Sequence, residues 1–247
     1  MEFKDRVVII TGGASGMGAA AAREFSKTGA EVVIVDRNEA LARAVAGEIG
    51  AVYKTGDVSS SAFCDAAVAE AVATKGRLDV LVNAAGIMVR ARGEHTSDEE
   101  WNRILAVNVS GTFFMCRAAI QAMKPRGSGS IVNFGSIWGD LGAAGVAAYC
   151  ASKGAVHNLT RALALDHARD GIRINAVCPG EVNTPMLQSE RKEPVTPELL
   201  IRLADTVPMG RLADPVEIAH MVLFLASDKA SYMTGSLVLV DAGFAAR

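Results

Sequence analysis

The chain has 247 residues, of which 50% are hydrophobic and 21% charged, and its formal net charge at pH 7 is −2. The apolar content excludes a disordered protein, and the near-neutral charge gives no electrostatic reason to expect nucleic acid or an anionic membrane as a partner. The longest charge-free stretch, residues 7–22, holds four glycines and is too short to span a bilayer. We therefore expect neither a nucleic-acid nor a membrane partner.

The N-terminus and the cysteines bear on the compartment. Residues 1–6 mix acids with bases ahead of an apolar run, which is not the pattern of a signal peptide. The four cysteines lie at least 28 residues apart, so no pair has the spacing of a metal site or of a C-x-x-C motif. We expect reduced thiols, no bound metal and a cytoplasmic protein.

Short, almost wholly apolar runs alternate along the chain with longer stretches rich in Ala, Leu, Arg and Glu. The short runs lack the alternation of a half-exposed strand, which indicates strands covered on both faces of a parallel sheet. They predict strands at residues 6–11, 31–36, 51–55, 78–83, 130–135, 172–178 and 237–240. The longer stretches predict helices at residues 16–28, 39–49, 61–75, 98–124, 147–169 and 215–227. This order predicts an α/β fold: a single doubly wound Rossmann-type domain over residues 1–247, with a seven-stranded, mostly parallel sheet between helix layers.

Capping signals mark two of the predicted helix starts. Ser97-Asp98-Glu99-Glu100 has the spacing of a capping box, and Asp214 precedes Pro215 at the first turn of the last predicted helix. The segment 184–210 breaks the alternation, because it holds four of the seven prolines and only a short helix start at Thr196. Two interpretations of this segment stay open, a lid over a ligand and an ordinary surface excursion.

A glycine-rich stretch from Gly12 to Gly18 follows the first predicted strand and opens the first helix. Glycines there let the backbone approach a pyrophosphate, and the helix N-terminus supplies amide donors. The spacing G-x-x-x-G-x-G differs from the G-x-G-x-x-G fingerprint. Its place between strand and helix nevertheless favours a dinucleotide site over a plain turn.

Asp36 ends the second predicted strand, 18 residues after Gly18. An acid there can accept hydrogen bonds from the adenosine ribose hydroxyls and repel a 2′-phosphate, which favours NAD. Arg37 works the other way, because a guanidinium attracts phosphate. A helix cap or a surface charge is the alternative interpretation of Asp36.

Tyr149 and Lys153 lie four residues apart near the start of a predicted helix, so they share one face. A nearby cation stabilises phenolate, so we expect the pKa of Tyr149 to be lowered from about 10, which makes it a usable general acid/base. Ser136 follows a strand, at the edge where parallel sheets bind ligands, and its hydroxyl can hold a substrate oxygen. A Tyr–Lys pair on its own is common on helices, so the pair becomes a candidate site only together with Ser136.

These residues together resemble the short-chain dehydrogenase/reductase family over essentially the whole chain. Thr11-Gly12-x-x-x-Gly16-x-Gly18 is similar to its cofactor motif, Asp57-Val58 to its adenine-contact pair, and Asn83-Ala84-Ala85-Gly86 to its N-N-A-G motif with Ala84 in place of the second Asn. Asn108, Ser136, Tyr149 and Lys153 match its catalytic residues, and Pro179-Gly180 with Thr184 resembles the segment that closes over the nicotinamide.

The resemblance implies hydride transfer between NAD(H) and a secondary alcohol or ketone, by a homotetramer paired through the helices at 98–124 and 147–169 and the last strand. Tyr149 would exchange the proton, Ser136 hold the substrate oxygen, Lys153 bind the nicotinamide ribose, and Asn108 hold a water of a proton relay. The implied cofactor contacts are Gly12, Ser15, Gly16, Met17, Gly18, Asp36, Arg37, Asp57, Val58, Asn83, Ala84, Ala85, Gly86, Tyr149, Lys153, Pro179, Gly180, Val182 and Thr184.

Two other functions remain as alternatives. A 3-ketoacyl carrier-protein reductase of the same family would mostly use NADPH, against which Asp36 argues, whereas a basic patch with Arg90 and Arg92 would favour it. A cofactor-binding regulator on the same fold typically lacks the Tyr or the Lys. Arg90 and Arg92 also fit an anionic substrate, although solvated surface charge is the simpler interpretation. We expect specificity from residues 88–94, 137–145, 181–183 and 184–210.

Overall fold

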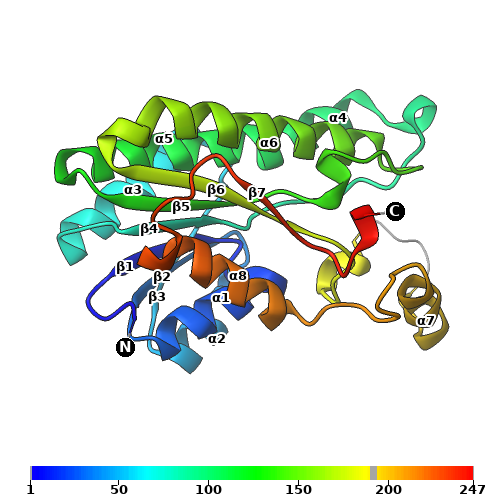
Figure 1. Cartoon of the computed structure of the whole chain (residues 1–247), viewed down its shortest axis with the longest axis horizontal. Helices are drawn as coiled ribbons and strands as arrows, with labels where there is room; N and C mark the ends of the chain where they lie inside the picture. Colours follow the sequence, from blue (N-terminus) through cyan, green and yellow to red (C-terminus); the bar gives the residue numbers. More distant parts are fainter. Residues whose placement is uncertain (1, 190–193, 247) are drawn as a thin grey trace.

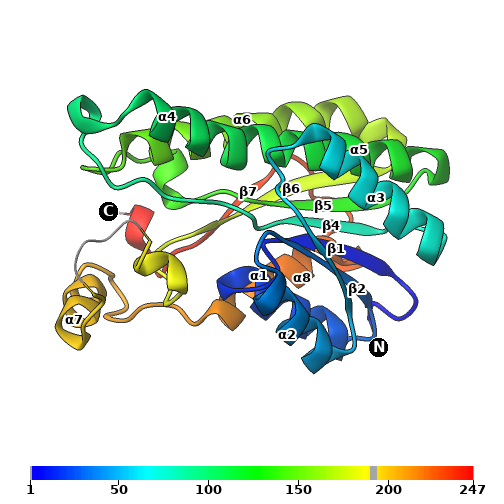
Figure 2. The same cartoon turned by 180° about the vertical axis from the view of Figure 1, so that it is seen from behind.

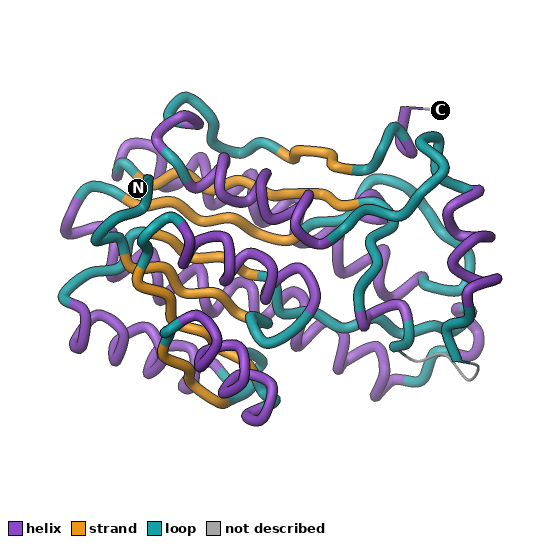
Figure 3. The backbone as a smooth tube through the Cα atoms, turned by 90° about the horizontal axis from the view of Figure 1, so that it is seen from below, coloured by secondary structure: helices purple, strands orange, loops and turns teal. Residues whose placement is uncertain are grey.

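The computed structural model describes residues 2–189 and 194–246 and contains one seven-stranded sheet. Its strands are β1 Val7–Thr11, β2 Glu31–Asp36, β3 Val52–Thr55, β4 Val80–Asn83, β5 Gly129–Phe134, β6 Ile172–Pro179 and β7 Leu237–Val240. They lie side by side in the order β3-β2-β1-β4-β5-β6-β7, and every pairing is parallel (Figure 3). The predicted Rossmann-type α/β sheet is therefore confirmed.

Two helix layers enclose this sheet (Figures 1 and 2). One layer contains α1 Gly16–Lys27, α2 Glu39–Ile49 and α8 Pro215–Ala226, and the other contains α3 Ser61–Lys75, α4 Asp98–Leu105, α5 Thr112–Met123 and α6 Ala147–His167. A further helix, α7 Pro197–Asp205, lies beyond the end of the sheet, apart from both layers. It follows the predicted start at Thr196, whose side chain caps it.

Successive side chains of the central strands pack into two hydrophobic cores, one on each face of the sheet, because side chains alternate between the faces. Val8 and Ile10 pack with α1, α2 and α8, whereas Ile9 and Leu81 pack with α3 and α5. All four side chains are completely buried. Burial on both faces is the physical reason why these strands read as unbroken apolar runs.

The structure corrects the single helix predicted at residues 98–124. It is interrupted by a π-helical segment, Ala106–Gly111, between α4 and α5. Segments of this kind widen the helix locally and often occur at functional sites. The run from 98 to 126 is long enough to span a membrane and contains an 18-residue window with a mean hydropathy of 1.3, but half of that window is buried in this fold. Packing against the sheet accounts for its apolar composition.

Both predicted capping signals are present as complete capping boxes. The Asp214 carboxylate accepts a hydrogen bond from Val216 N (2.9 Å), and the Glu217 side chain accepts one from Asp214 N (2.8 Å). Ser97 and Glu100 do the same for α4. These bonds satisfy amide groups that a helix start leaves without partners.

We predict that Asp214→Ala lowers the free energy of unfolding by about 1 kcal/mol, because it removes the N-cap of α8. Urea unfolding followed by circular dichroism measures this loss. Asp166→Ala is the matched control, since it removes the same charge from an exposed position inside α6. An equal loss in both variants would mean that the charge, and not the cap, carries the effect.

Candidate active site

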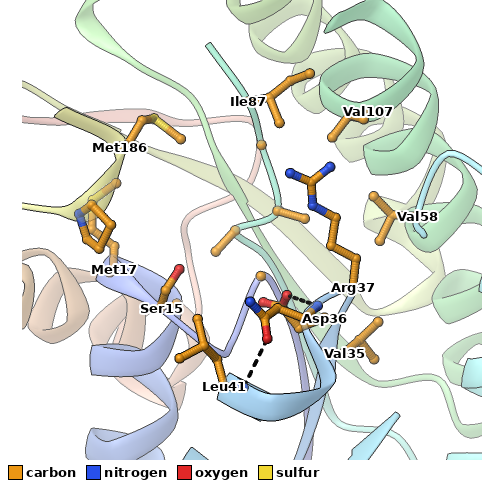
Figure 4. Close-up of a pocket in the computed structure, with 18 of the residues that line it drawn as sticks. Ser15, Met17, Val35, Asp36, Arg37, Leu41, Val58, Ile87, Val107 and Met186 are labelled. Carbon is orange, nitrogen blue, oxygen red and sulfur yellow. Dashed lines mark hydrogen bonds between the residues drawn. The ribbon is translucent and has the colours of Figure 1, made fainter. Parts of the chain in front are cut away.

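The first cavity, of about 290 Å³, lies at the carboxyl ends of the strands around the point where the sheet order reverses (Figure 4). In open α/β sheets, ligands bind at this point. The cavity is lined by Gly12, Ser15, Gly16, Met17, Gly18, Val35, Asp36, Arg37, Asn38, Leu41, Gly56, Asp57, Val58, Ala84, Ala85, Gly86, Ile87, Val107, Thr184, Pro185 and Met186. Most of the predicted cofactor residues therefore lie together around this cavity.

The glycine-rich turn can take only glycine at two of its positions. A Cβ on Gly12 would lie 2.8 Å from Ala85 N, and one on Gly18 would lie 2.2 Å from Gly12 O. Gly12 also has a φ of +63°, which other residues rarely adopt. This close approach leaves the N-terminus of α1 open to the cavity, with its amide groups and positive dipole end available to a pyrophosphate.

Asp36 is fixed at the end of β2. Its carboxylate accepts hydrogen bonds from Ala14 N (3.1 Å) and Asn38 N (2.9 Å), which tie the glycine-rich turn to the second strand. Arg37 extends along the cavity toward Ile87 and Val107, away from that carboxylate (Figure 4). The acid is therefore held in place at the cavity wall, while the exposed guanidinium lies elsewhere in the same cavity.

Asn83 is the predicted cofactor contact that lines neither cavity. Its side chain is 3% exposed and donates to Asn133 Oδ1 (3.0 Å) and Cys116 Sγ (3.3 Å), while its own Oδ1 has no hydrogen-bond partner among the described residues. It belongs to a buried polar network between β4, β5 and α5. Its neighbours Ala84, Ala85 and Gly86 form the cavity wall.

A second cavity, of about 220 Å³, adjoins the first and shares Met17, Ala84, Gly86, Thr184 and Met186 with it. It brings together three of the four predicted catalytic residues, Ser136, Tyr149 and Lys153. Pro179, Gly180 and Val182 line this cavity as well. The shared wall means that a ligand in one cavity can contact a ligand in the other.

Tyr149 and Lys153 are both 6% exposed, and the burial governs their protonation. Burial raises the pKa of Tyr149 to about 12, against a smaller lowering by the hydroxyl of Ser136. Burial also lowers the pKa of Lys153 to about 8. The expected lowering of the Tyr149 pKa is therefore wrong for the protein alone, because desolvation of the phenolate outweighs the lowering by Ser136 and by the charge of Arg90. The Lys153 ammonium donates to Phe134 O (2.7 Å) and lies 5.6 Å from the centre of the Tyr149 ring.

Asn108, the fourth predicted catalytic residue, lies behind the cavities in the π-helical segment. Its Nδ2 donates to Ile87 O (2.9 Å) and Ser152 Oγ (3.0 Å), and its Oδ1 accepts from Ile87 N (2.8 Å). The side chain is 1% exposed and lines neither cavity. In this structure it holds the loop after β4 against α6.

The sequence analysis missed several residues that line the cavities. They belong to no motif, and only the folded chain brings them to the site. Val146, at the start of α6, reaches the second cavity, and Val107 reaches the first from the π-helical segment. The predicted specificity segments contribute Met88, Arg90, Trp138, Ala143, Ala144, Glu181, Val182, Thr184, Met186, Leu187 and Leu203. Arg92 and Asp140 do not line it; Arg92 instead pairs with Glu94 (2.8 Å).

The chain is similar to known proteins over nearly its whole length. Residues 12–245 match the family model described as enoyl-(acyl carrier protein) reductase. The chain is 43% identical over 250 residues to 2-(S)-hydroxypropyl-CoM dehydrogenase 3 of Xanthobacter autotrophicus, with 99% of this chain and 98% of that protein covered. It is 42% identical over 247 residues to cyclopentanol dehydrogenase of Comamonas testosteroni, with 98% of each covered.

A third relative is 2,5-dichloro-2,5-cyclohexadiene-1,4-diol dehydrogenase of Sphingobium indicum, 42% identical over 244 residues, with 97% of this chain and 96% of that protein covered. Matches of this extent over nearly the whole length show family membership. The chain belongs to the short-chain dehydrogenase/reductase family, as an oxidoreductase that transfers a hydride between a nicotinamide cofactor and a secondary alcohol or ketone.

Proposed function

We propose that the protein interconverts a small secondary alcohol and its ketone with NAD(H), and that Tyr149 is the general acid/base. The observation that carries this proposal is the convergence of Tyr149, Ser136 and Lys153 in a cavity that shares a wall with the dinucleotide cavity. The cofactor supplies the hydride chemistry when bound. The glycine cradle at Gly12 and Gly18 and the amide donors of α1 fit its pyrophosphate.

The chain's own residues divide the remaining work. Tyr149 gives its phenol proton to the carbonyl oxygen in reduction and takes the alcohol proton in oxidation. The Ser136 hydroxyl donates a hydrogen bond to the same oxygen. Lys153 binds the nicotinamide ribose, and Asn108 serves a proton relay, the two roles that the family resemblance implies for these positions.

The second cavity favours a small and mostly apolar substrate. Its volume of about 220 Å³ is below the roughly 300–1,000 Å³ of sites for drug-sized molecules. Met88, Trp138, Val146, Leu187 and Leu203 supply apolar wall, and Arg90 and Glu181 supply the charged side chains of the lining besides Lys153. The named relatives, which include a cyclopentanol and a cyclohexadienediol dehydrogenase, support an alcohol over a carrier-protein substrate. The complete catalytic set argues against a regulator.

The segment 184–210 fits a lid over both cavities. Thr184, Met186, Leu187 and Leu203 from this segment line them, and Arg90 Nε donates to Ser189 O (3.1 Å), which joins the segment to the loop after β4. Residues 190–193 of the predicted lid lie outside the described residues.

A cytoplasmic homotetramer remains our proposal for the assembly and its compartment. The four cysteines are free thiols, which suits a reducing compartment. Trp101, Phe113 and Leu165 are exposed on α4, α5 and α6, and Leu239 is exposed on β7. Apolar side chains on these helices and on the last strand suit burial against further copies of the chain in a symmetric assembly.

A panel of small secondary alcohols, assayed with NAD by NADH absorbance, tests the proposed reaction. We predict turnover with at least one cyclic or short-chain alcohol and a loss of about 10²–10⁴-fold in kcat for Tyr149→Phe. NADH binding, followed by fluorescence, should stay within about twofold, because the ring still packs. A Phe variant that keeps half the wild-type kcat would remove Tyr149 as the proton donor. Tyr53→Phe, distant from the second cavity, is the control.

The cofactor preference depends on Asp36. We predict that the wild type prefers NAD over NADP by at least tenfold in kcat/KM, because a fixed carboxylate repels a 2′-phosphate in a partly desolvated cleft. Asp36→Asn, which keeps one oxygen for Ala14 N, should erode the preference by improving NADP use. Glu39→Gln removes a carboxylate outside the cavity and should leave the ratio unchanged. Equal use of both cofactors by the wild type would refute the NAD assignment.

The pH dependence follows from the raised pKa of Tyr149. With a pKa of about 12 the phenol stays protonated across the neutral range, so it is ready to donate in ketone reduction and must be deprotonated for alcohol oxidation. We predict that kcat/KM for oxidation rises from pH 6 to pH 9, while kcat/KM for reduction does not rise from pH 7 to pH 9. Initial rates in both directions measure this. A flat oxidation profile would place the working pKa of Tyr149 below 6.

A further inference from the structure

His157 continues the catalytic face of α6. It follows Tyr149 and Lys153 at the same four-residue spacing, so the three side chains lie on one side of the helix. His157 is 1% exposed and lines neither cavity. Its ring therefore contacts protein rather than ligand, and its polar atoms must find their partners inside the fold.

The partners of the His157 ring include the backbone of Ser136. Ser136 N donates to His157 Nε2 (3.3 Å), and the Cys178 thiol lies at the same distance from that nitrogen. A backbone N–H is always a donor, so Nε2 must be the unprotonated nitrogen and Nδ1 must carry the proton. Nδ1 lies 3.2 Å from Asp140 Oδ1, without the alignment of a full hydrogen bond.

The chain on either side of Ser136 is shaped to receive this ring. A Cβ on Gly135 would lie 2.5 Å from His157 Nε2, and one on Gly139 would lie 2.3 Å from Cε1. Glycine at both positions lets the backbone of the catalytic turn close around the imidazole. The same turn presents Trp138 to the substrate cavity, and Trp138 N donates to Ser136 Oγ (3.1 Å).

We infer that His157 is a positioning residue, which holds the Ser136 turn in place through Nε2 and does so only as the neutral imidazole with its proton toward Asp140. The inference rests on the proposed role of Ser136. A protonated ring would bring an N–H against the Ser136 N–H, so the hydrogen bond would be lost and the turn would be released from the helix. His157 thus links the protonation of a buried side chain to the placement of a catalytic hydroxyl.

The titratable and charged groups around His157 determine the pH at which its ring becomes protonated. Asp140 faces it from the catalytic turn, the Cys178 thiol from β6, and Lys153 and Arg161 from its own helix. Burial lowers the pKa of His157, Asp140 raises it, and the two cations lower it further. Burial raises the pKa of Cys178 to about 12, so that group stays a thiol. The net direction favours neutral His157 at neutral pH.

Replacement by two side chains separates positioning from packing. His157→Leu removes the acceptor, and we expect kcat for ketone reduction to fall about 10- to 100-fold because the Ser136 N–H is left buried without a partner. His157→Gln offers an oxygen in place of Nε2 and should recover kcat to within about threefold of the wild type. NADH affinity should stay within about twofold in both variants. If Gln loses as much as Leu, the hydrogen bond is not the function of His157.

A double-mutant cycle with Ser136→Ala distinguishes this inference from the proposed function. When Ser136 carries no hydroxyl, His157→Leu should lower kcat less than threefold further. Equal losses in both backgrounds would show that His157 acts on folding rather than through Ser136. If Ser136→Ala alone leaves kcat unchanged, the proposed role of Ser136 fails instead.

The pH profile of ketone reduction provides an independent readout, because protonated Tyr149 adds no acidic limb in that direction. We expect an acidic limb below about pH 6.5 in the wild type and none in His157→Gln. Asp140→Asn, at an exposed position, removes the charge that raises the pKa of His157 and should move the limb to lower pH. A limb that persists unchanged in both variants would overturn the inference.

Discussion

The pairing of β1 with β2 on one side and with β4 on the other determines where the chemistry takes place. After β1 the chain passes to α1 in one helix layer, and after β4 it passes to α4 in the other layer (Figure 1). The two connections therefore leave the sheet edge on opposite faces and open a crevice between them. Both cavities form along this edge. Gly12 and Ala85 approach each other too closely for a side chain between them, and both line the first cavity.

Burial sets the protonation of Tyr149 and Lys153, the two central groups of the proposed catalytic set. Water would stabilise both the phenolate of Tyr149 and the ammonium of Lys153, and the fold removes it from both. The ammonium donates one strong hydrogen bond to Phe134 O, but no cation among the described residues offsets the desolvation of the phenol. The protein alone consequently holds Tyr149 as an acid. Any positive charge brought beside the phenol would lower its pKa, so ligand binding and proton transfer are electrostatically linked.

Local sequence signals determined most of the fold. The apolar runs identified all seven strands, and the five inner strands contain few polar residues because they are buried on both faces, whereas the edge strands β3 and β7 are partly exposed. Caps at Ser97 and Asp214 fixed two helix starts, because their hydrogen bonds span only three residues. The glycine-rich turn and Tyr149 with Lys153 were likewise visible from spacing alone, and the structure brings them to adjacent cavities.

The features that the sequence did not reveal all depend on distant parts of the chain. The π-helical segment places the Asn108 side-chain amide against the backbone N–H and C=O of Ile87. No local sequence pattern predicts this contact. The pKa of Tyr149 depends on how completely the fold excludes water, whereas the sequence showed only the neighbouring Lys153. Asn83 looked like a cavity residue by its motif, but the network with Asn133 and Cys116 draws its side chain into the interior.

The register of α6 against the end of β5 connects these observations. Lys153 Nζ donates to Phe134 O, and His157 Nε2 accepts from Ser136 N, so two polar groups one turn apart on the helix bind backbone atoms two residues apart in the chain. A slip of α6 by one turn, about 5.4 Å, would break both bonds at once and separate Tyr149 from Ser136. The hydrogen bonds that bring the proposed catalytic groups together are therefore also bonds that hold this helix against the end of β5.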